Sequence, residues 1–358
     1  MSRKRHIAVV CNYELKPDRI GGMDRFFIAY DSELKRRGWI VNWFFAGNNH
    51  PDFHSNLDVR LAGIQSLENF FIKHLHEGKE YAIVVTHFIA LCTPFFKKVK
   101  EETPAYIIAV DHNPRPLEGF NLKKRIKNKI RGILYASYIN HFVGVSQYTA
   151  DAIIEDYGKT LTKKTSVVYN GIDLKSYKKR RRENFGKFIV ASHLRKSKGI
   201  GDLINAVSAL SEEIKQQIRI DIFGEGPLET ELKELVSKCN LPEVIRFHGS
   251  SSQLPDQFQN YSYLLQPTYM ECFSLSILES LASNVPVITT TVGGNLEIID
   301  NSINGYIFEP KDTRQLTSIL NDIMTGKKGI DKPVNGIIEE RFNLQAMLSN
   351  HIKLLPCT

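Results

Sequence analysis

Short apolar segments alternate with helix-length amphipathic segments along the chain, and this alternation limits the possible folds more than any other feature. In the first half, the apolar runs occupy residues 6–11, 39–45, 81–88, 106–112 and 141–146. These runs are rich in β-branched and aromatic residues and are apolar at nearly every position, which is typical of strands buried on both faces. Helical patterns separate them, for example at residues 23–37 and 149–157. Such alternation predicts a parallel sheet with right-handed crossovers.

The second half repeats this alternation with strands and helices of its own. Its apolar runs occupy residues 186–192, 218–224, 244–249, 261–267 and 285–290, and its helical patterns residues 200–210, 228–239 and 275–283. A chain of 358 residues is long enough for two domains. We therefore predict an α/β protein with two Rossmann-like domains facing each other across a cleft. The expected bounds are residues 1–180 and 181–358, with the last helix free to pack back on the first domain.

The charge is distributed unequally between the two halves. Residues 1–183 contain 31 Lys and Arg against 19 Asp and Glu, a net charge of +12. Residues 184–358 contain 16 against 20, a net charge of −4. The basic run KKRRR at residues 178–182 is typical of a solvated linker, so we expect the domain boundary there. The difference in charge between the halves indicates that the first half meets an anionic partner such as phosphate, nucleic acid or a lipid surface.

Two features indicate a reduced cytoplasmic protein. The first apolar run is far shorter than a signal-peptide core, and no later run reaches the roughly 18 apolar residues of a membrane span. The five cysteines, Cys11, Cys92, Cys239, Cys272 and Cys357, are widely spaced and form no CxxC pair. This spacing favours reduced thiols, mostly in the core, over a disulfide framework or a zinc site.

A Gly21-Gly22 pair follows the first predicted strand and precedes a helix. Two glycines let the backbone approach an anion closely, and a helix N-terminus adds unpaired amides and a positive dipole end. The same pair is also common in simple turns, so both interpretations stay open on this segment. The full Gly-x-Gly-x-x-Gly fingerprint of dinucleotide sites is missing, which disfavours a dehydrogenase.

The strongest local signal is Glu271-Cys-Phe-Ser-Leu-Ser-Ile-Leu-Glu279. Ser274 is a suitable cap for the helix that follows, and Glu279 falls about one and a half turns into that helix. The N-terminal amides of the helix can hold a phosphate, and the two carboxylates can accept hydrogen bonds from sugar hydroxyls. Taken alone, Glu279 is better explained as a surface glutamate on an amphipathic helix.

This segment resembles the E-x7-E motif of the retaining GT-B glycosyltransferases, in particular family 4. Other motifs of that family have counterparts in the family's order, between about residues 7 and 308. They are the V-S at Val145-Ser146, the N-G-I-D turn at residues 168–173, the G-R-L-x-x-x-K-G segment at residues 193–199, the G-x-G-P loop at residues 223–227, the G-G-x-x-E turn at residues 292–297 and the closing N-G strand at residues 304–308. The resemblance implies a GT-B fold.

The resemblance also implies roles for particular carboxylates and cations. Glu271 matches the carboxylate that binds donor-sugar hydroxyls near the reacting carbon, and Glu279 matches the one that binds the nucleotide ribose. Lys198 matches the lysine that neutralises the donor diphosphate. An ammonium group there stabilises the charge that develops as the glycosidic bond breaks.

Other positions match the remainder of the donor site. Gly22 matches a glycine of the phosphate-facing loop, and His112 matches a histidine that meets the donor sugar. The amides of Leu275 and Ser276 are expected to face the phosphates. The remaining donor-binding positions implied by the motifs are Gly224, Phe273 and Ser274.

The chain departs from the family pattern at two places. His193 replaces the arginine of the G-R-L segment, and Ser192 replaces its glycine. The family usually places two cations on the diphosphate, so Arg195 or a partly charged His193 is expected to supply the second. Cys272 and Ser274 replace the glycines of the usual E-G-F-G, which is expected to reshape the sugar pocket.

The implied reaction is sugar transfer with retention of anomeric configuration, in which the leaving diphosphate helps to deprotonate the acceptor. The family requires no metal, no Asp-x-Asp triplet is present, and we expect no cofactor. A UDP-sugar is the expected donor and a glycan or lipid-linked glycan the expected acceptor. By analogy alone, the expected pathway is bacterial surface polysaccharide synthesis, such as that of lipopolysaccharide.

The segment 121–135 predicts a basic amphipathic helix. Its apolar residues follow helical spacing, and six lysines and arginines fill much of the remainder. One interpretation is a domain helix with its apolar stripe on the sheet and its lysines in water. The other is peripheral contact with an anionic membrane at the cytoplasmic face. Nucleic acid is not an expected partner, since no basic groove with interleaved aromatic residues is present.

Two alternative functions remain beside the glycosyltransferase. An enzyme similar to UDP-N-acetylglucosamine 2-epimerase would share the architecture, but it would need other acid and base residues. A non-catalytic nucleotide-sugar-binding or scaffold protein is suggested by the histidine at position 193.

Overall fold

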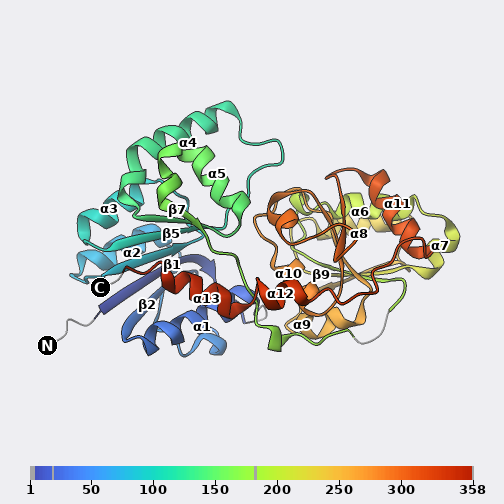
Figure 1. Ribbon diagram of the computed structural model, residues 1–358, viewed down its shortest axis with the longest axis horizontal. Coiled ribbons are helices and arrows are strands. Elements are labelled where there is room, and N and C mark those ends of the chain that lie inside the picture. The colour runs from blue at the N-terminus through green and yellow to red at the C-terminus, as the bar shows by residue number, and fades with distance from the viewer. Residues whose placement is uncertain (1–4, 18–19, 181–183, 357–358) are drawn as a thin grey trace. The chain divides into compact units, whose positions relative to one another are not determined.

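The computed structural model describes residues 5–17, 20–180 and 184–356, which form two compact units (Figure 1). The first unit is Met1–Asn170 together with Leu344–Thr358, and the second unit is Gly171–Asn343. Each unit contains one parallel sheet covered by helices. Arg181 and Arg182 of the predicted linker lie outside the described residues.

The first unit has a seven-stranded parallel sheet with the order β3-β2-β1-β4-β5-β6-β7. The strands are β1 (Arg5–Glu14), β2 (Trp39–Ala46), β3 (Val59–Leu61), β4 (Ile83–His87), β5 (Tyr106–Asp111), β6 (His141–Gly144) and β7 (Thr165–Val167). The helices are α1 (Gly22–Arg36), α2 (Leu67–His76), α3 (Pro94–Glu102), α4 (Leu122–Tyr135), α5 (Gln147–Tyr157) and α13 (Leu344–Lys353), with 3₁₀ turns η1 (Asp52–His54), η2 (Ala136–Tyr138) and η3 (Lys159–Lys164). The order reverses between β1 and β4, the switch point usual for Rossmann domains.

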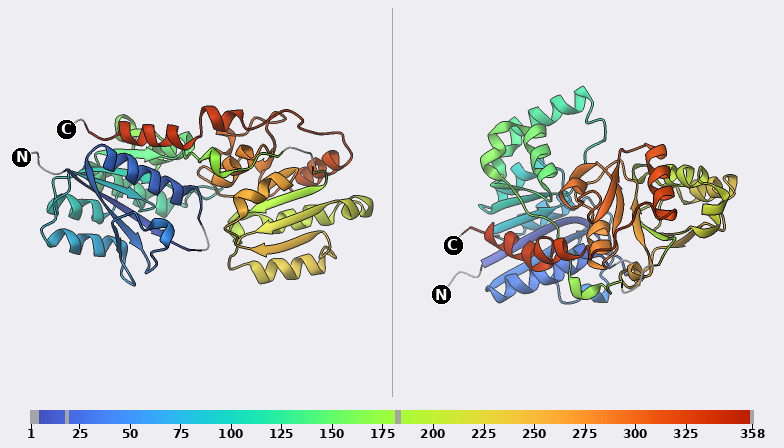
Figure 2. Two further views of the ribbon diagram at one scale, coloured as in Figure 1. Left: turned by 90° about the horizontal axis from the view of Figure 1, so that it is seen from below. Right: turned by 45° about the vertical axis from the view of Figure 1, so that its right-hand side comes forward.

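Alternate side chains of β2 show why this sheet needs helices on both faces. Trp43 and Phe45 contact Phe27 of α1, with ring centroids 5.3 and 5.5 Å apart. Phe44 points to the opposite face and meets Phe71 of α2 at 4.8 Å. The apolar residues at successive positions are therefore buried on two faces, as expected for a doubly wound sheet. Figure 2 shows the helices on both sides.

The C-terminal helix α13 belongs to the first unit and packs beside α1. His351 of α13 lies against Phe26 and Tyr30 of α1, with ring centroids 5.0 and 5.7 Å apart. The last segment of the chain thus completes the helical layer over one face of the first sheet.

The second unit has a six-stranded parallel sheet with the order β10-β9-β8-β11-β12-β13. The strands are β8 (Lys187–Ala191), β9 (Arg219–Phe223), β10 (Ile245–Gly249), β11 (Tyr263–Gln266), β12 (Val287–Thr290) and β13 (Gly305–Phe308). The helices are α6 (Ile200–Ser208), α7 (Glu212–Gln217), α8 (Glu229–Lys238), α9 (Leu254–Gln257), α10 (Leu275–Ala282), α11 (Thr313–Met324) and α12 (Gly336–Glu340), with 3₁₀ turns η4 (Leu174–Ser176), η5 (Lys196–Lys198), η6 (Phe258–Asn260) and η7 (Gly293–Glu297). Its switch point lies between β8 and β11.

The predicted α/β architecture with two Rossmann-like domains is confirmed. Each of the ten apolar runs overlaps an observed strand. The runs did not indicate β3 and β7, which have three residues each and are only half-buried. They also did not indicate β13, which was expected only from the N-G motif of the resemblance. Cys11, Cys92 and Cys272 are buried free thiols, whereas Cys357 lies outside the described residues.

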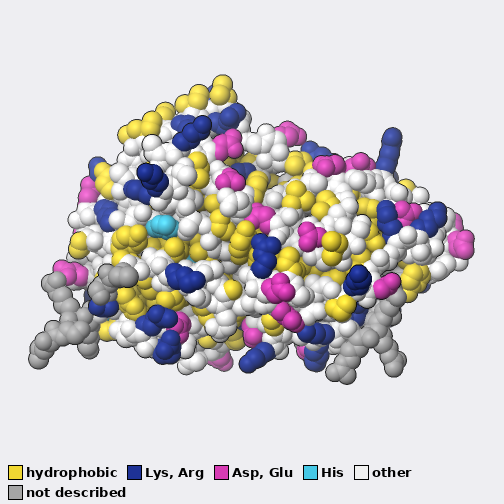
Figure 3. Space-filling view, viewed as in Figure 1, with side chains coloured by type: hydrophobic (Ala, Val, Ile, Leu, Met, Phe, Trp, Pro, Cys, Tyr) yellow, Lys and Arg dark blue, Asp and Glu magenta, His cyan; other side chains and the backbone are white. Residues whose placement is uncertain are grey.

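Helix α4 corrects one interpretation of the sequence. Its apolar stripe does not lie on the sheet: Leu122, Ile126, Ile130, Ile133 and Leu134 are all exposed. Figure 3 shows hydrophobic side chains and cations side by side along the top of the molecule, where Figure 1 labels α4. Within the described part of the chain, no helix combines the length and apolarity needed to cross a bilayer.

Candidate active site

Two loops of the second unit meet at the switch point, where ligands of doubly wound sheets bind. The loop after β8 contains the turn η5, and the loop after β11 contains Glu271. Thr268 Oγ1 and the Tyr269 amide both donate to the carbonyl oxygen of Ser197, at 3.1 and 2.7 Å. These hydrogen bonds attach the two loops to each other.

Gly199 ends η5 and permits this close approach. Its φ is +64°, in the left-handed region that favours glycine. A Cβ atom at this position would lie 1.8 Å from the carbonyl oxygen of Pro267, so the loop after β11 would have to move away. The glycine therefore keeps the preceding residue, Lys198, next to the second loop.

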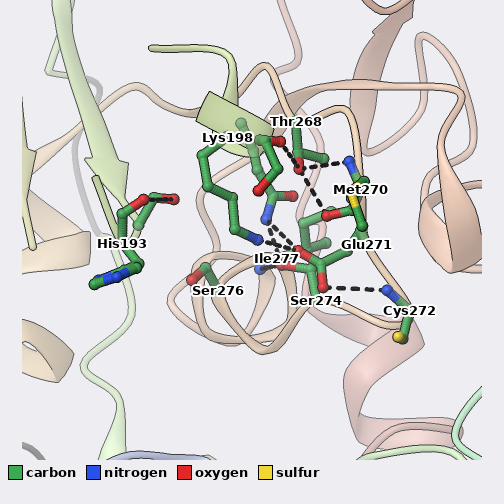
Figure 4. Close-up of polar contacts among 12 residues, drawn as sticks. His193, Lys198, Thr268, Met270, Glu271, Cys272, Ser274, Ser276 and Ile277 are labelled. Carbon is green, nitrogen blue, oxygen red and sulfur yellow. Dashed lines mark hydrogen bonds and ion pairs between the residues drawn. The ribbon is translucent and has the colours of Figure 1, made fainter. Parts of the chain in front are cut away.

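Lys198 and Glu271 form an ion pair across these loops, with Nζ and Oε2 2.7 Å apart (Figure 4). The two side chains are 12% and 16% exposed, so a ligand still has access to them. The Cys272 amide donates to Glu271 Oε1 at 3.2 Å, and Gln266 Nε2 lies 3.5 Å from Oε2. Both carboxylate oxygens are thus oriented by neighbouring donors.

Helix α10 begins directly after this pair. Ser274 caps it, because its hydroxyl oxygen accepts from the Ile277 amide at 3.4 Å and from Gln266 Nε2 at 2.6 Å. The Ser276 hydroxyl donates to the carbonyl of Ala191 at the end of β8, at 2.8 Å. The amides of the first turn have no partner within a helix, and the dipole there favours an anion. Leu275 and Ser276, both half-buried, carry the first two of these amides.

Glu279 lies further along α10 and has a partner that the sequence did not indicate. The hydroxyl of Tyr177, which is buried, donates to Glu279 Oε1 at 3.0 Å. Tyr177 directly follows η4, just after the N-G-I-D turn. It is 102 positions from Glu279, so no local pattern could have paired them.

Two predicted donor-binding residues are engaged in packing. Gly224 has φ +130°, and a Cβ atom there would lie 2.0 Å from the carbonyl oxygen of Ser192. Phe273 is buried, and its ring meets Phe342 with centroids 5.1 Å apart. Phe273 therefore offers only its backbone to a ligand.

The structure separates Lys198 from the two candidates for a second cation. His193 is exposed and lies apart from the ion pair in Figure 4. Arg195 lines a hollow of about 560 Å³ with residues of η5, α6 and α8, and this lining includes neither Lys198 nor Glu271. Lys198 is thus the cation that the fold brings to Glu271.

In the first unit, His112 follows β5 and is held by two neighbours at the end of β4. His112 Nε2 and His87 Nδ1 share a hydrogen bond of 3.0 Å, in which one ring donates and the other accepts. Phe88 stacks on His112, with ring centroids 4.0 Å apart. Burial, and secondarily repulsion from His351, lowers the pKa of His112 to about 3, so the ring is neutral at physiological pH.

Gly22 begins α1 in the first unit, beside a carboxylate. Asp24 Oδ2 accepts from the Gly21 amide at 2.8 Å and from the Tyr13 hydroxyl at 3.0 Å. Its Oδ1 lies 3.1 Å from His54 Nε2. The Gly21 amide is therefore already satisfied within the unit, and Gly22 stays a predicted phosphate contact.

The fold thus brings Lys198, Glu271, Ser274 and the start of α10 together in the second unit. In the first unit, His112 lies just after β5, and Gly22 lies at the start of α1. Sequence reasoning missed the side chains that hold these residues, because none belongs to a recognised motif. They are Tyr177, Gln266 and Thr268 in the second unit, and His87 and Phe88 in the first.

Two family models match the chain, one for each unit. Residues 20–176 match the model described as Glycosyltransferase Family 4. Residues 172–338 match the model described as Glycosyl transferases group 1.

Curated relatives carry glycosyltransferase or synthase names. The N-acetyl-alpha-D-glucosaminyl L-malate synthase of Bacillus anthracis is 29% identical over 274 residues, covering 74% of this chain and 68% of that protein. The lipopolysaccharide core biosynthesis mannosyltransferase LpsB of Rhizobium meliloti is 27% identical over 224 residues, covering 56% and 64%. Matches to three further relatives cover 56%, 35% and 49% of those proteins, so the chain spans about half their length.

Solved structures, two of which are described as glycosyltransferases, share the fold over nearly the whole chain. The Anabaena protein HepE, determined in complex with UDP and glucose, superposes with a TM-score of 0.79. The match has 18% identity and covers 97% of this chain and 98% of that one. The fold is therefore GT-B.

Proposed function

The chain has the GT-B fold, and glycosyltransferase family models match each of its two units; from this premise we propose that it is a glycosyltransferase. It transfers a sugar from a nucleotide-sugar, with UDP as the nucleotide, to a glycan or lipid-linked glycan. The transfer retains the anomeric configuration, as in family 4. The ion pair of Lys198 and Glu271 beside the N-terminus of α10 is the observation that carries the proposal.

Each part of this arrangement suits one part of a nucleotide-sugar. The Lys198 ammonium and the amides of Leu275 and Ser276 are positive groups for the diphosphate. Glu271, with its oxygens already oriented, accepts hydrogen bonds from sugar hydroxyls. Glu279, held by Tyr177, accepts from the ribose hydroxyls. Donor binding would replace the ion pair between Lys198 and Glu271 with contacts to phosphate and sugar.

The proposed reaction exchanges one bond at the anomeric carbon. The bond from this carbon to the diphosphate oxygen breaks, and the bond to the acceptor oxygen forms on the same face. The acceptor proton moves to the departing diphosphate oxygen, so no protein carboxylate is needed as a base. Lys198 stabilises the negative charge that the leaving group gains. His112, neutral at physiological pH, acts as a hydrogen-bonding group toward the donor sugar.

Two relatives support the choice of substrates. HepE is described in complex with UDP and glucose, which favours a UDP-sugar donor. LpsB is named for lipopolysaccharide core biosynthesis, which favours an acceptor in bacterial surface polysaccharide synthesis. The proposed place of action is the cytoplasmic face of the membrane.

A second candidate is a protein that binds a nucleotide-sugar without transferring it. The placement of Arg195 on the hollow beside α8, with His193 apart from the ion pair, favours this alternative. A site with one cation would bind the diphosphate yet stabilise the leaving group less. Turnover of any donor separates the two candidates.

The first experiment measures thermal unfolding of the protein with a panel of nucleoside diphosphates and nucleotide-sugars. A ligand that binds the folded state raises the midpoint by mass action. We expect a shift with UDP species that is lost in Lys198→Ala. Lys196→Ala, in the same turn η5 but on the hollow beside α8, is the matched control and keeps the shift. No shift with any nucleotide would contradict the donor site.

The second experiment measures release of UDP from the donor found in this way. Glu271→Gln keeps the size of the side chain but removes its charge, and we expect a loss of turnover of at least tenfold with nucleotide binding retained. The anomeric configuration of the product, read by NMR, tests retention. Absence of turnover in a protein that binds UDP would favour the non-catalytic candidate.

A further inference from the structure

Helix α4 presents an apolar face to solvent. Leu122 is 70% exposed, Ile126 51%, Ile130 50%, Ile133 81% and Leu134 53%. At about 100° per residue, these five side chains fall within an arc of about 120° on one side of the helix. A continuous apolar arc of this kind on a surface helix marks an interaction site.

The opposite face of α4 packs on its own unit. Asn128 and Gly132 are the buried residues of the helix. A Cβ atom at Gly132 would lie 1.9 Å from the carbonyl oxygen of Tyr157 at the end of α5, so the two helices touch there. The helix is therefore anchored through its small-residue side, and the apolar arc points away from the unit.

Cations border the apolar arc on both sides. By helical position, Lys127 lies just beyond one edge of the arc and Lys123 just inside it, whereas Arg125 and Lys129 lie beyond the other edge. The segment 121–135 contains no Asp or Glu. Among the described residues, no carboxylate forms an ion pair with Lys123, Arg125 or Lys127. The ammonium group of Lys129 donates to the backbone carbonyl of Glu155. Lys123, Arg125 and Lys127 are thus available to an external anion.

We propose that α4 docks this protein on the surface of a bilayer that contains anionic phospholipids. The apolar arc enters the boundary between headgroups and acyl chains, and the flanking Lys and Arg side chains reach the lipid phosphates. A nucleic acid would match the cations but not the five exposed aliphatic side chains. A protein partner would match the aliphatic arc. Cations on both borders of the arc, however, are better matched by the uniformly anionic plane of a bilayer surface than by a protein.

The docking surface is carried by α4 alone and does not depend on catalysis. Its link to a lipid-linked acceptor rests on the proposed function. A bilayer that holds the first unit would raise the local concentration of an acceptor embedded in the same bilayer. The experiment therefore measures binding to lipid separately from donor binding.

The test is co-flotation of the full chain with vesicles of phosphatidylcholine alone and of phosphatidylcholine with phosphatidylglycerol. We expect binding only to the anionic vesicles, weakened by salt. The double variant I126S/I133S should lose at least tenfold in affinity by loss of insertion. The double variant K123Q/K127Q should lose at least threefold by loss of charge.

Matched controls are K159Q/K163Q, an exposed lysine pair with the same spacing in the first unit, and Ile64→Ser, which removes an isolated exposed aliphatic side chain. Both should bind vesicles like the wild type. Lys198→Ala should also bind vesicles normally, even if nucleotide binding fails, so the two proposals can fail separately. Unchanged thermal midpoints show that the α4 variants are folded.

Two outcomes would overturn the proposal. One is no binding to anionic vesicles, or binding that both α4 variants retain in full. The other is self-association of the wild type in sedimentation that I126S/I133S abolishes while vesicles are not bound, which would assign the arc to a protein interface.

Discussion

At the scale of single residues, the candidate donor site depends on pairs that hold one another in place. Lys198 is oriented by Glu271, and Glu279 by Tyr177. In the first unit, His112 is oriented by His87. Tyr177 and His87 contribute only through Glu279 and His112, the residues that they orient, so the removal of either should have a modest and specific effect.

Tyr177→Phe tests the pair at Glu279. The change removes one hydrogen bond, worth about 1 kcal/mol, so the Kd for UDP should rise by about fivefold. Isothermal titration calorimetry measures this Kd. Tyr261→Phe is the control, because its hydroxyl also donates to a carboxylate of the second unit, Asp221, at 2.9 Å. An equal effect in both variants would mean that Tyr177 acts through general stability.

His87→Phe tests the pair at His112. Loss of the shared hydrogen bond, worth about 1 kcal/mol, should lower the rate of UDP release by about fivefold while the Kd for UDP stays unchanged. His87→Asn offers an amide that can bond to His112 again, so it should recover part of the rate. Equal rates in the two variants would show that His87 does not position His112 through this hydrogen bond.

At the scale of elements, glycines decide how closely neighbouring segments approach. Gly199 brings η5 against the loop after β11, and Gly132 brings α4 against α5. The motif pattern pointed to Gly199 as part of a lysine-glycine pair. Nothing in the sequence distinguished Gly132 from any other glycine in a helix.

Gly132→Ala should destabilise the protein by about 1–3 kcal/mol, because the new methyl group collides with the Tyr157 carbonyl. Gly201→Ala in α6 is the matched control, since the nearest atom to its Cβ would be 4.0 Å away. The control should be neutral or stabilising by up to about 1 kcal/mol. Urea denaturation measures both, and a neutral Gly132→Ala would show that the helices separate easily.

At the scale of the whole molecule, three buried histidines make the first unit sensitive to acid. Burial lowers the pKa of His351 to about 3, and burial with repulsion from His112 and His351 lowers that of His87. Burial and repulsion from His351 lower the pKa of His112 to about 3 as well. The unfolded chain binds these protons near pH 6.5, whereas folded His112 and His351 bind theirs only near pH 3, and folded His87 binds its proton well below pH 6.5. The contribution of these histidines to the free energy of unfolding is therefore fully present above about pH 6.5 and is lost as the pH decreases toward 3.

His351→Phe should reduce this loss, because an aromatic ring stays against Phe26 and Tyr30 but no longer takes up a proton. The thermal midpoint should fall less between pH 7 and pH 5 in this variant than in the wild type. His50→Gln, at an exposed position, is expected to follow the wild type. Parallel curves for wild type and His351→Phe would show that His351 does not contribute.

Much of the architecture followed from local patterns. Continuous apolar runs indicated ten strands, and a serine before an apolar helical pattern indicated the capped start of α10. The strands β3 and β7 were missed, because three half-buried residues leave no periodic signal. The motifs indicated Lys198 and Glu271 as candidates, but only by resemblance.

The sequence by itself determined the two strand-helix series and the helix that follows Glu271, because hydrophobic periodicity and capping act between residues a few positions apart. Only the tertiary structure decided that Lys198 meets Glu271 and that Tyr177 meets Glu279, since these partners are 73 and 102 positions apart. It also decided which face of α4 is exposed. The apolar pattern showed that the helix has two faces, but the face that packs is the one where Gly132 lets α5 approach.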